Sequence, residues 1–248
     1  MVLASAGFVM VWSKDEYVLE VHSVDESLIR DQVFALVKEL YEKRQAEKRF
    51  IPGQTAIPCS GKVYDHEEMI SLVDSCLDFW LTSGRFAEEF EKKFAAFLGV
   101  KFVSLANSGS SANLLAISAL TSHRFGSVRL KPSDEVITVA AAFPTTVNPI
   151  VQNRLVPVFV DIQLPTYNVD TSILEKALSK KTRAIFLAHM LGNPFDVKTV
   201  LDFCEDNHLL LIEDCCDSLG SKYKGKHVGT FGELSTFGFY PPHHITMG

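Results

Sequence analysis

Residues 209–220 read Leu-Leu-Leu-Ile-Glu-Asp-Cys-Cys-Asp-Ser-Leu-Gly, an apolar run that ends abruptly in two carboxylates. Such a run is typical of a strand that is buried on both faces, as in a parallel sheet. A carboxylate at the end of a buried strand is costly unless it meets a cation. The stretch therefore predicts a parallel strand with a polar site at its carboxyl end, and the competing interpretation is that the acids are solvated in a loop.

Further short apolar or β-branched runs alternate with helical patterns along the chain. The predicted strands are Phe102–Ala106, Glu135–Ala140, Val156–Val160, Ala184–Ala188, Leu209–Ile212 and Leu234–Phe239. Helices are predicted to start at Ser110, Asp170 and Asp196, and aspartate is a good helix N-cap. The alternation predicts an α/β fold with a mostly parallel sheet and helices on both faces. In such sheets ligands bind at the carboxyl ends of the strands.

Three helices are predicted before the first strand. Ser23 and Glu26 match a capping box at the start of the first helix. A second helix is predicted over Glu67–Trp80, and a third ends at Gly99. The third helix bears an aromatic stripe that we expect to pack in the core, formed by Phe86, Phe90, Phe94 and Phe97.

The chain has 248 residues, of which 47% are hydrophobic and 22% charged, so it is long enough to bury a sizeable core. The predicted organisation is a disordered or poorly defined leader at 1–22, an N-terminal helix at 23–50 and a large domain at 51–248. Residues 1–12 are apolar but too few to span a bilayer. A net charge of -6 without a dense Lys/Arg block argues against binding to nucleic acid or to an anionic membrane.

Five cysteines are present, an odd number, and none shows the paired spacing of a zinc site. We interpret them as buried free thiols in a reducing cytosol, which predicts a cytoplasmic protein without a protein-bound metal in this part of the chain.

A candidate phosphate site follows the first predicted strand, at Asn107-Ser108-Gly109-Ser110. Glycine lets the backbone approach an anion closely, serine adds a hydroxyl donor, and a helix N-terminus directs free N–H groups to the same point. The competing interpretation is an ordinary Ser/Gly helix cap, which these residues fit equally well.

The last residues, 237–248, read Phe-Gly-Phe-Tyr-Pro-Pro-His-His-Ile-Thr-Met-Gly. This segment, with Leu191-Gly192-Asn193-Pro194-Phe195-Asp196 and Phe143-Pro144-Thr145-Thr146, resembles the fold-type-I sugar nucleotide aminotransferases, the DegT family. The resemblance covers about residues 52–248. It implies the three-layer large domain of a PLP-dependent transferase with a mostly parallel sheet, incomplete at the C-terminus.

In that family a lysine forms the Schiff base with the cofactor, and this sequence has His243 at the corresponding position. Imidazole cannot form that bond, so the resemblance implies pyridoxal or pyridoxamine 5'-phosphate held non-covalently, mainly in the pyridoxamine form. The swap, together with the run Glu213–Asp217, is characteristic of the small subgroup of CDP-4-keto-6-deoxy-D-glucose 3-dehydrases.

The resemblance also assigns the candidate site residues. His243 is implied as the catalytic base, and imidazole exchanges protons near neutral pH. The residues implied to bind the cofactor are Gly109 and Ser110 at the phosphate, Phe143 stacked on the ring, Asp214 at the pyridinium nitrogen and Asp217 near the ring hydroxyl. One departure is Gly238, where the family has a serine phosphate ligand, so phosphate binding is expected to be weaker or to rest more on Ser110 and Ser235.

The implied function is dehydration at C3 of a CDP-4-keto-6-deoxyhexose on the route to the 3,6-dideoxysugars of lipopolysaccharide O-antigen. The implied partners are the nucleotide-sugar substrate, a flavin/iron–sulfur reductase and a second copy in a homodimer. The family continues past the equivalent of Gly248, where the dehydrases place their iron–sulfur cysteines, so we expect this chain to be a fragment. The alternatives are a PLP-dependent sugar nucleotide aminotransferase and an inactive fragment that retains a cofactor-binding or dimerisation surface.

Overall fold

The computed structural model describes residues 25–58 and 63–247, and these divide into two compact units. The predicted leader at 1–22 lies outside the described residues, as does Ser23. The first unit holds helices α1 (Glu26–Ala46) and α2 (His66–Leu77). The sequence prediction placed α2 in the large domain, whereas the structure packs it against α1, and the extent of the cofactor-binding domain stays a prediction.

Helix α1 begins with a different cap from the predicted one. The Asp25 side chain accepts a hydrogen bond from the backbone N–H of Ser27 and is the N-cap, so the capping box at Ser23 and Glu26 is wrong. Aspartate serves here because its carboxylate reaches the free N–H groups of the first turn. Along the helix, Arg30 holds α2 through ion pairs of 2.6 Å to Asp74 and 3.2 Å to Asp78.

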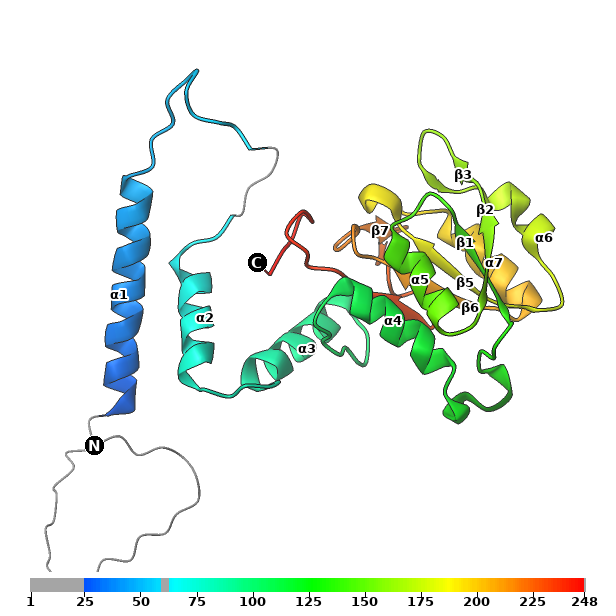
Figure 1. Cartoon of the computed structure of the whole chain (residues 1–248), viewed down its shortest axis with the longest axis horizontal. Helices are drawn as coiled ribbons and strands as arrows, with labels where there is room; N and C mark the ends of the chain where they lie inside the picture. The colour runs from blue at the N-terminus through cyan, green and yellow to red at the C-terminus, as the bar shows by residue number, and fades with distance from the viewer. Residues whose placement is uncertain (1–24, 59–62, 248) are drawn as a thin grey trace, which may run out of the picture. The chain divides into compact units, whose positions relative to one another are not determined.

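The second unit is built on a five-stranded sheet in which every pairing is parallel (Figure 1). The strand order is β2-β1-β5-β6-β9. The strands are β1 (Glu135–Val139), β2 (Val156–Val160), β5 (Thr182–Ala188), β6 (Leu210–Asp214) and β9 (Leu234–Thr236). All five coincide closely with predicted strands, so the α/β fold class with a parallel sheet is confirmed.

Helices and short elements connect these strands. The helices are α3 (Arg85–Leu98), α4 (Gly109–Leu120), α5 (Pro144–Gln152), α6 (Leu174–Ala177) and α7 (Val197–Asn207), with 3-10 turns η1 (His123–Val128), η2 (Thr171–Ile173) and η3 (Met190–Gly192). Two short hairpins pair β3 (Ile162–Gln163) with β4 (Asn168–Val169) and β7 (Lys222–Tyr223) with β8 (Lys226–His227). The predicted caps Asp170 and Asp196 are confirmed, as is Gly99, whose φ of 73° lies in the left-handed region.

Successive strand residues face opposite sides of the sheet, and each side has its own core. On one side Ile185 and Leu187 of β5 pack with Val197 and Val200 of α7. On the other side Ala184 and Phe186 pack with a cluster that includes Ala116, Ile117 and Leu120 of α4 and Ile150 of α5. Helices therefore cover both faces, and the sheet is the middle of three layers, as predicted.

The predicted strand Phe102–Ala106 is wrong. None of the described strands pairs with this segment, and a strand needs a neighbour to satisfy its backbone groups. The N–H of Leu105 donates instead to the Glu91 carboxylate at 2.8 Å, and Phe102 is exposed. A cavity of about 820 Å³ is lined by α3, by this segment and by β9.

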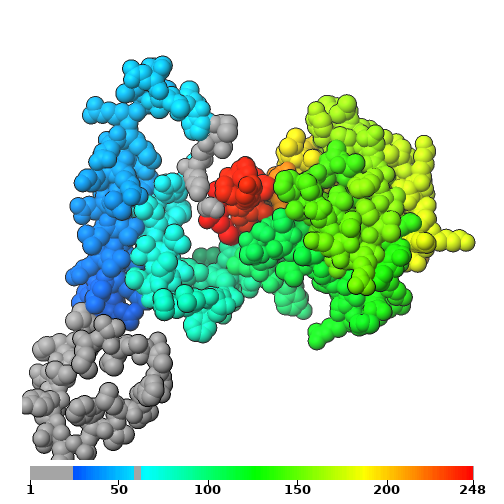
Figure 2. All heavy atoms as spheres, viewed as in Figure 1, coloured from blue at the N-terminus to red at the C-terminus, as the bar shows by residue number. Residues whose placement is uncertain are grey.

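The aromatic stripe of α3 packs only in part, because Phe90 and Phe94 contact Phe237 and Phe239 while Phe97 stays half-exposed. The C-terminal segment, red in Figure 2, lies at the surface of the second unit. Among the helices of the described residues, none is long and apolar enough to cross a membrane.

Candidate active site

Asp214, the last residue of β6, is the centre of a buried hydrogen-bonded cluster at the carboxyl ends of the strands. Its Oδ2 accepts from Asn113 Nδ2 at 2.9 Å and from Thr146 Oγ1 at 2.8 Å, while its Oδ1 accepts from the backbone N–H of Cys216 at 3.1 Å. The hydroxyl of Thr236 donates in turn to Asn113 Oδ1. These three donors are neutral, as is the Cys216 thiol that also hydrogen-bonds to the carboxylate, and no ion pair to it forms among the described residues.

This arrangement leaves a buried negative charge that hydrogen bonds alone stabilise. A buried carboxylate of this kind is suited to a cationic ligand, because the positive charge would supply what the protein lacks. The hydrogen bonds also fix its position, since the donors Asn113 and Thr146 lie on α4 and α5, and Asn113 is itself held by Thr236 of β9. Three separate elements are therefore tied to one carboxylate.

Phe143 lies between β1 and α5, where it occupies the N-cap position of the helix. Its carbonyl accepts a hydrogen bond of 3.0 Å from the N–H of Thr146, which links it to the residue that donates to Asp214. The side chain is 69% exposed although it follows a buried strand. An exposed aromatic ring at a strand end can stack on a flat heteroaromatic ligand.

The first turn of α4 holds the two candidate phosphate residues. Ser108 is the N-cap and accepts a hydrogen bond of 3.1 Å from the N–H of Ser111, which leaves Gly109 and Ser110 as the first two residues of the helix. The side chain of Ser110 is exposed. The twelve-residue helix directs its positive end at this turn, which favours an anion there.

His243 is held close to Asp217. Its Nδ1 lies 2.9 Å from Asp217 Oδ1, and its backbone N–H donates to the carbonyl of Tyr240 at 2.9 Å. A neutral ring with its proton on Nδ1 would present a donor to this carboxylate and leave the lone pair on Nε2. The adjacent His244 points elsewhere and donates from Nε2 to the carbonyl of Leu219 at 2.8 Å.

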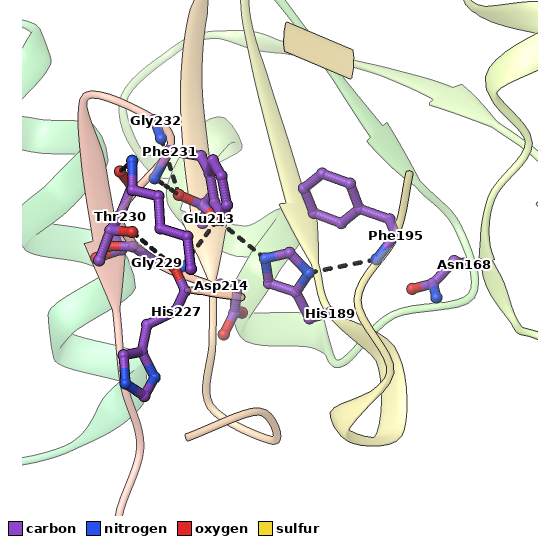
Figure 3. A network of polar contacts seen from close by, with 12 residues as sticks. Asn168, His189, Phe195, Glu213, Asp214, His227, Gly229, Thr230, Phe231 and Gly232 are labelled. Carbon is purple, nitrogen blue, oxygen red and sulfur yellow. Dashed lines mark hydrogen bonds and ion pairs between the residues drawn. The ribbon is translucent and has the colours of Figure 1, made fainter. Parts of the chain in front are cut away.

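A second polar network surrounds Glu213, the neighbour of Asp214 in β6 (Figure 3). Glu213 is fully buried, and its carboxylate accepts backbone hydrogen bonds of 2.8 Å from Gly229, Phe231 and Gly232. His189 Nε2 donates a fourth at 3.0 Å, while His189 Nδ1 accepts from the N–H of Phe195 at 3.4 Å.

The pKa of Glu213 is lowered by this environment. Burial is the largest single influence and acts to raise the pKa, but the hydrogen bonds from His189, Gly232 and Gly229 together outweigh it. Glu213 is therefore a structural carboxylate whose hydrogen bonds come from the chain itself.

Metal-binding groups also meet at this point, because donor atoms of His189, Glu213 and Cys215 lie within 4.8 Å of one another. The oxygens of Glu213 and both ring nitrogens of His189 are already used in hydrogen bonds. Burial raises the pKa of the Cys215 thiol well above its usual value, so the sulfur stays protonated. The group is better explained as a hydrogen-bonded support for the turn at 229–232 than as a metal centre.

The structure brings two predicted site residues into contact and gives another a hydrogen-bond partner within the chain. Asp217, predicted near a ring hydroxyl, lies against His243. The hydroxyl of Ser235, considered as a phosphate ligand, donates to the carbonyl of Gly229 at 2.7 Å. Asn113, Thr146 and Thr236 were not predicted. A signal for Asn113 exists in the sequence, since it is the one amide side chain in a helix that otherwise consists of apolar residues, glycine and serine.

Comparison with known proteins gives matches over most of the chain. The profile of the DegT/DnrJ/EryC1/StrS aminotransferase family matches residues 63–248. The lipopolysaccharide biosynthesis protein RfbH of Salmonella typhimurium is 52% identical over 220 residues, 89% of this chain and 50% of its own. The dTDP-4-dehydro-2,6-dideoxy-D-glucose 3-dehydratase of Saccharopolyspora spinosa is 48% identical, over 88% of this chain and 47% of its own.

Among solved structures, the E. coli GDP-4-keto-6-deoxy-D-mannose-3-dehydratase with bound hydrated PLP matches with a TM-score of 0.71 at 35% identity. The match covers 76% of this chain and 48% of that structure. The chain thus spans about half the length of the relatives that it matches.

Proposed function

The chain belongs to the DegT/DnrJ/EryC1/StrS aminotransferase family, and from this premise we propose that it is a pyridoxamine-phosphate-dependent sugar nucleotide 3-dehydrase. It removes the C3 hydroxyl of a nucleotide-linked 4-keto-6-deoxyhexose on the route to 3,6-dideoxysugars of lipopolysaccharide. The observation that carries the proposal is His243, which stands in place of the family lysine and contacts Asp217 at 2.9 Å. The name of one relative, a 3-dehydratase, supports the same reaction class, and the name of RfbH supports a place in lipopolysaccharide biosynthesis.

The residues present fit the cofactor. Asp214 is a buried carboxylate with only neutral donors, and a protonated pyridine nitrogen is a cation of the size and chemistry that it lacks. Gly109 and Ser110 would hold the phosphate at the N-terminus of α4, and the exposed ring of Phe143 would cover one face of the pyridine. When bound, the group supplies an amine for the substrate ketone and a ring that withdraws electrons.

His243 is the residue that moves a proton. Asp217 holds the proton on Nδ1, so Nε2 is the atom that accepts a proton during the reaction. Asp217 also fixes the orientation of the ring and stabilises the imidazolium that forms when Nε2 is protonated, as carboxylates do for catalytic histidines. Asp214 keeps its charge beside the cofactor nitrogen and so maintains the electron demand of the ring.

The substrate nucleotide and the partners are part of the proposal. We favour a CDP-sugar, while relatives carry dTDP and GDP sugars in their names. A flavin/iron–sulfur reductase would supply the electrons that complete the removal of the hydroxyl, and a second copy would complete a homodimer. An aminotransferase is disfavoured because His243 stands at the position of the family lysine and residues 227–248 contain no lysine.

The test compares the wild-type protein, expressed from its complete gene, with the His243→Asn variant of the same protein. Each is assayed in the presence of pyridoxamine phosphate, CDP-4-keto-6-deoxyglucose and reductase. We expect the variant to lose at least a thousandfold in turnover and to bind the cofactor with unchanged affinity, because the phosphate and ring contacts remain. Mass analysis of the sugar would detect loss of one oxygen. Retained turnover in His243→Asn, or an amino sugar as the wild-type product, would refute the function.

A further inference from the structure

Leu191 has an unusual backbone for a leucine. Its φ of 54° and ψ of 30° lie in the left-handed region, where the Cβ atom of an ordinary residue comes too close to the following carbonyl oxygen. The side chain is 75% exposed, so packing within the described part of the chain does not offset this cost. Strained residues of this kind persist where the surrounding structure holds them, and they cluster at functional sites. The position therefore needs an explanation from function.

Hydrogen bonds from two other segments hold the loop that carries this leucine, between β5 and α7. Asn168 of β4 donates from Nδ2 to the carbonyl of Asn193 at 3.0 Å, and its Oδ1 accepts from the N–H of Met190 at 3.1 Å. From the other side, the Ser221 hydroxyl donates to the carbonyl of Gly192 at 2.7 Å. Because these side chains bind the backbone of the loop, its shape does not depend on the leucine side chain.

The same loop borders the candidate active site. The N–H of His189 donates to the carbonyl of Asp214 at 3.1 Å. A Cβ atom on Gly192 would come within 3.1 Å of the carbonyl oxygen of Asp217, so these two segments are in contact. Leu191 lies between these contacts in sequence, and β5 and β6 are neighbouring parallel strands. The exposed leucine is therefore at the edge of the sheet where Asp214 and Asp217 lie.

We propose that Leu191 contacts the substrate sugar and recognises its C6 methyl group. This step rests on the proposed function, which makes the substrate a nucleotide-linked 4-keto-6-deoxyhexose. In such a sugar the C6 methyl is an apolar group that replaces the hydroxymethyl of an ordinary hexose. Asp217 and His243 are polar and suit the hydroxyl and carbonyl groups of a sugar. Against the leucine, a methyl group leaves water favourably, whereas a C6 hydroxyl would lose a hydrogen-bond partner.

The experiment compares two sugars that differ only at C6. Isothermal titration calorimetry measures the affinity of the cofactor-loaded protein, expressed from its complete gene, for CDP-6-deoxy-D-glucose and for CDP-D-glucose, and then for the matching dTDP pair. These sugars carry a hydroxyl at C4, so they cannot condense with the cofactor amine. We expect the wild type to bind the 6-deoxy sugar about tenfold more tightly or better, as one methyl-sized contact allows.

Two substitutions of Leu191 test the contact. Leu191→Gly should reduce the preference to about twofold or less, whereas Leu191→Met keeps an apolar side chain and should retain it. In turnover of the 4-keto-6-deoxyhexose, Leu191→Gly should raise KM about tenfold and leave kcat within about twofold, because the contact is made equally in the ground and transition states. The glycine variant should also be at least as stable to heat as the wild type, since glycine adopts the left-handed backbone without strain.

Arg154→Gly is the matched control. Arg154 also has a left-handed backbone, with φ of 61°, and it is exposed just before β2, at the opposite, amino-terminal edge of the sheet. Its replacement relieves the same strain and should leave the sugar preference and KM unchanged. An equal loss of preference in this variant would mean that Leu191→Gly acts through a general change in the fold, and it would overturn the inference.

The remaining outcomes separate the inference from the proposed function. A preference that survives Leu191→Gly would overturn the inference, and continued dehydration would leave the proposed function standing. A change in oligomeric state of Leu191→Gly, with the preference kept, would assign Leu191 to a subunit contact instead. A wild type that binds neither pair of sugars would overturn the inference together with the substrate class. A wild type that shows the Leu191-dependent preference and yields an amino sugar would refute the proposed dehydration alone.

Discussion

Replacing Glu213 with glutamine should destabilise the second unit by about 2–6 kcal/mol. The carboxylate accepts four hydrogen bonds, three from backbone N–H groups and one from His189. A glutamine amide keeps one oxygen for two of these donors and turns its NH₂ group toward the other two. Two buried donors left unpaired cost about 1–3 kcal/mol each, which gives the stated range.

The same substitution should remove a pH dependence. The pKa of Glu213 is below its usual value of 4.5, so its contribution to stability is complete above pH 4.5 and is lost as the pH falls through the lower pKa of the folded state. Glu213→Gln cannot titrate at this position. The difference in unfolding free energy between wild type and variant should therefore be constant near neutrality and shrink below pH 4.5.

Urea unfolding followed by circular dichroism, at intervals from pH 7 to pH 3, measures both effects. Glu205→Gln, on the exposed side of α7, is the matched control and should change stability by less than about 0.5 kcal/mol. Two results would show that the network around Glu213 does not stabilise the second unit as described. One is a destabilisation of Glu213→Gln below about 1 kcal/mol at pH 7. The other is a difference in unfolding free energy between wild type and variant that grows as the pH falls.

Three further outcomes are expected at the site itself. Borohydride treatment of the cofactor-loaded protein followed by peptide mass analysis should find no pyridoxyl group on any lysine, since His243 replaces the Schiff-base residue, and a lysine adduct would contradict this. Asp214→Asn should weaken cofactor binding about tenfold to a hundredfold by loss of the charge opposite the ring nitrogen, measured by absorbance titration, and unchanged affinity would show that the ring does not meet this carboxylate. Asp217→Asn should lower kcat about tenfold or more with cofactor affinity within twofold, and a loss confined to affinity would return Asp217 to the cofactor-binding role predicted from the sequence.

Strand positions were predictable because the physical signal is local. Runs such as Ala184–Ala188 and Leu209–Ile212 are apolar on both faces, and only a strand between two helical layers accommodates them. Phe102–Ala106 has a similar composition, yet composition says nothing about whether a neighbouring strand is available, and here none of the described strands pairs with it. The N-cap at Asp25 was missed because several residues near the start of the helix could accept the same hydrogen bonds, and composition does not show which of them does.

The sequence indicated a set of candidate site residues, which stays a prediction, but not the contacts between them. Resemblance indicated Asp214, Asp217 and His243, and it could not show that the second carboxylate lies against the histidine. Asn113 and Thr146 were missed because they are 101 and 68 residues from Asp214 in sequence. Contacts over such separations follow from the strand order, which places α4 and α5 beside the end of β6.

Glu213 and Asp214 show why neighbouring acids in one strand take different roles. Adjacent strand residues face opposite sides of the sheet, so the two carboxylates meet different surroundings although both are buried. Glu213 receives four donors from the chain itself, and no further ligand is needed to stabilise its charge. Asp214 lies at the strand end where ligands bind in parallel sheets, and its partners come from α4, α5 and the turn after β6, so its carboxylate is the one of the two that is placed to meet a ligand. We therefore propose Asp214, and not Glu213, as the residue that meets the cofactor, because the chain itself uses the Glu213 carboxylate to hold the turn at 229–232.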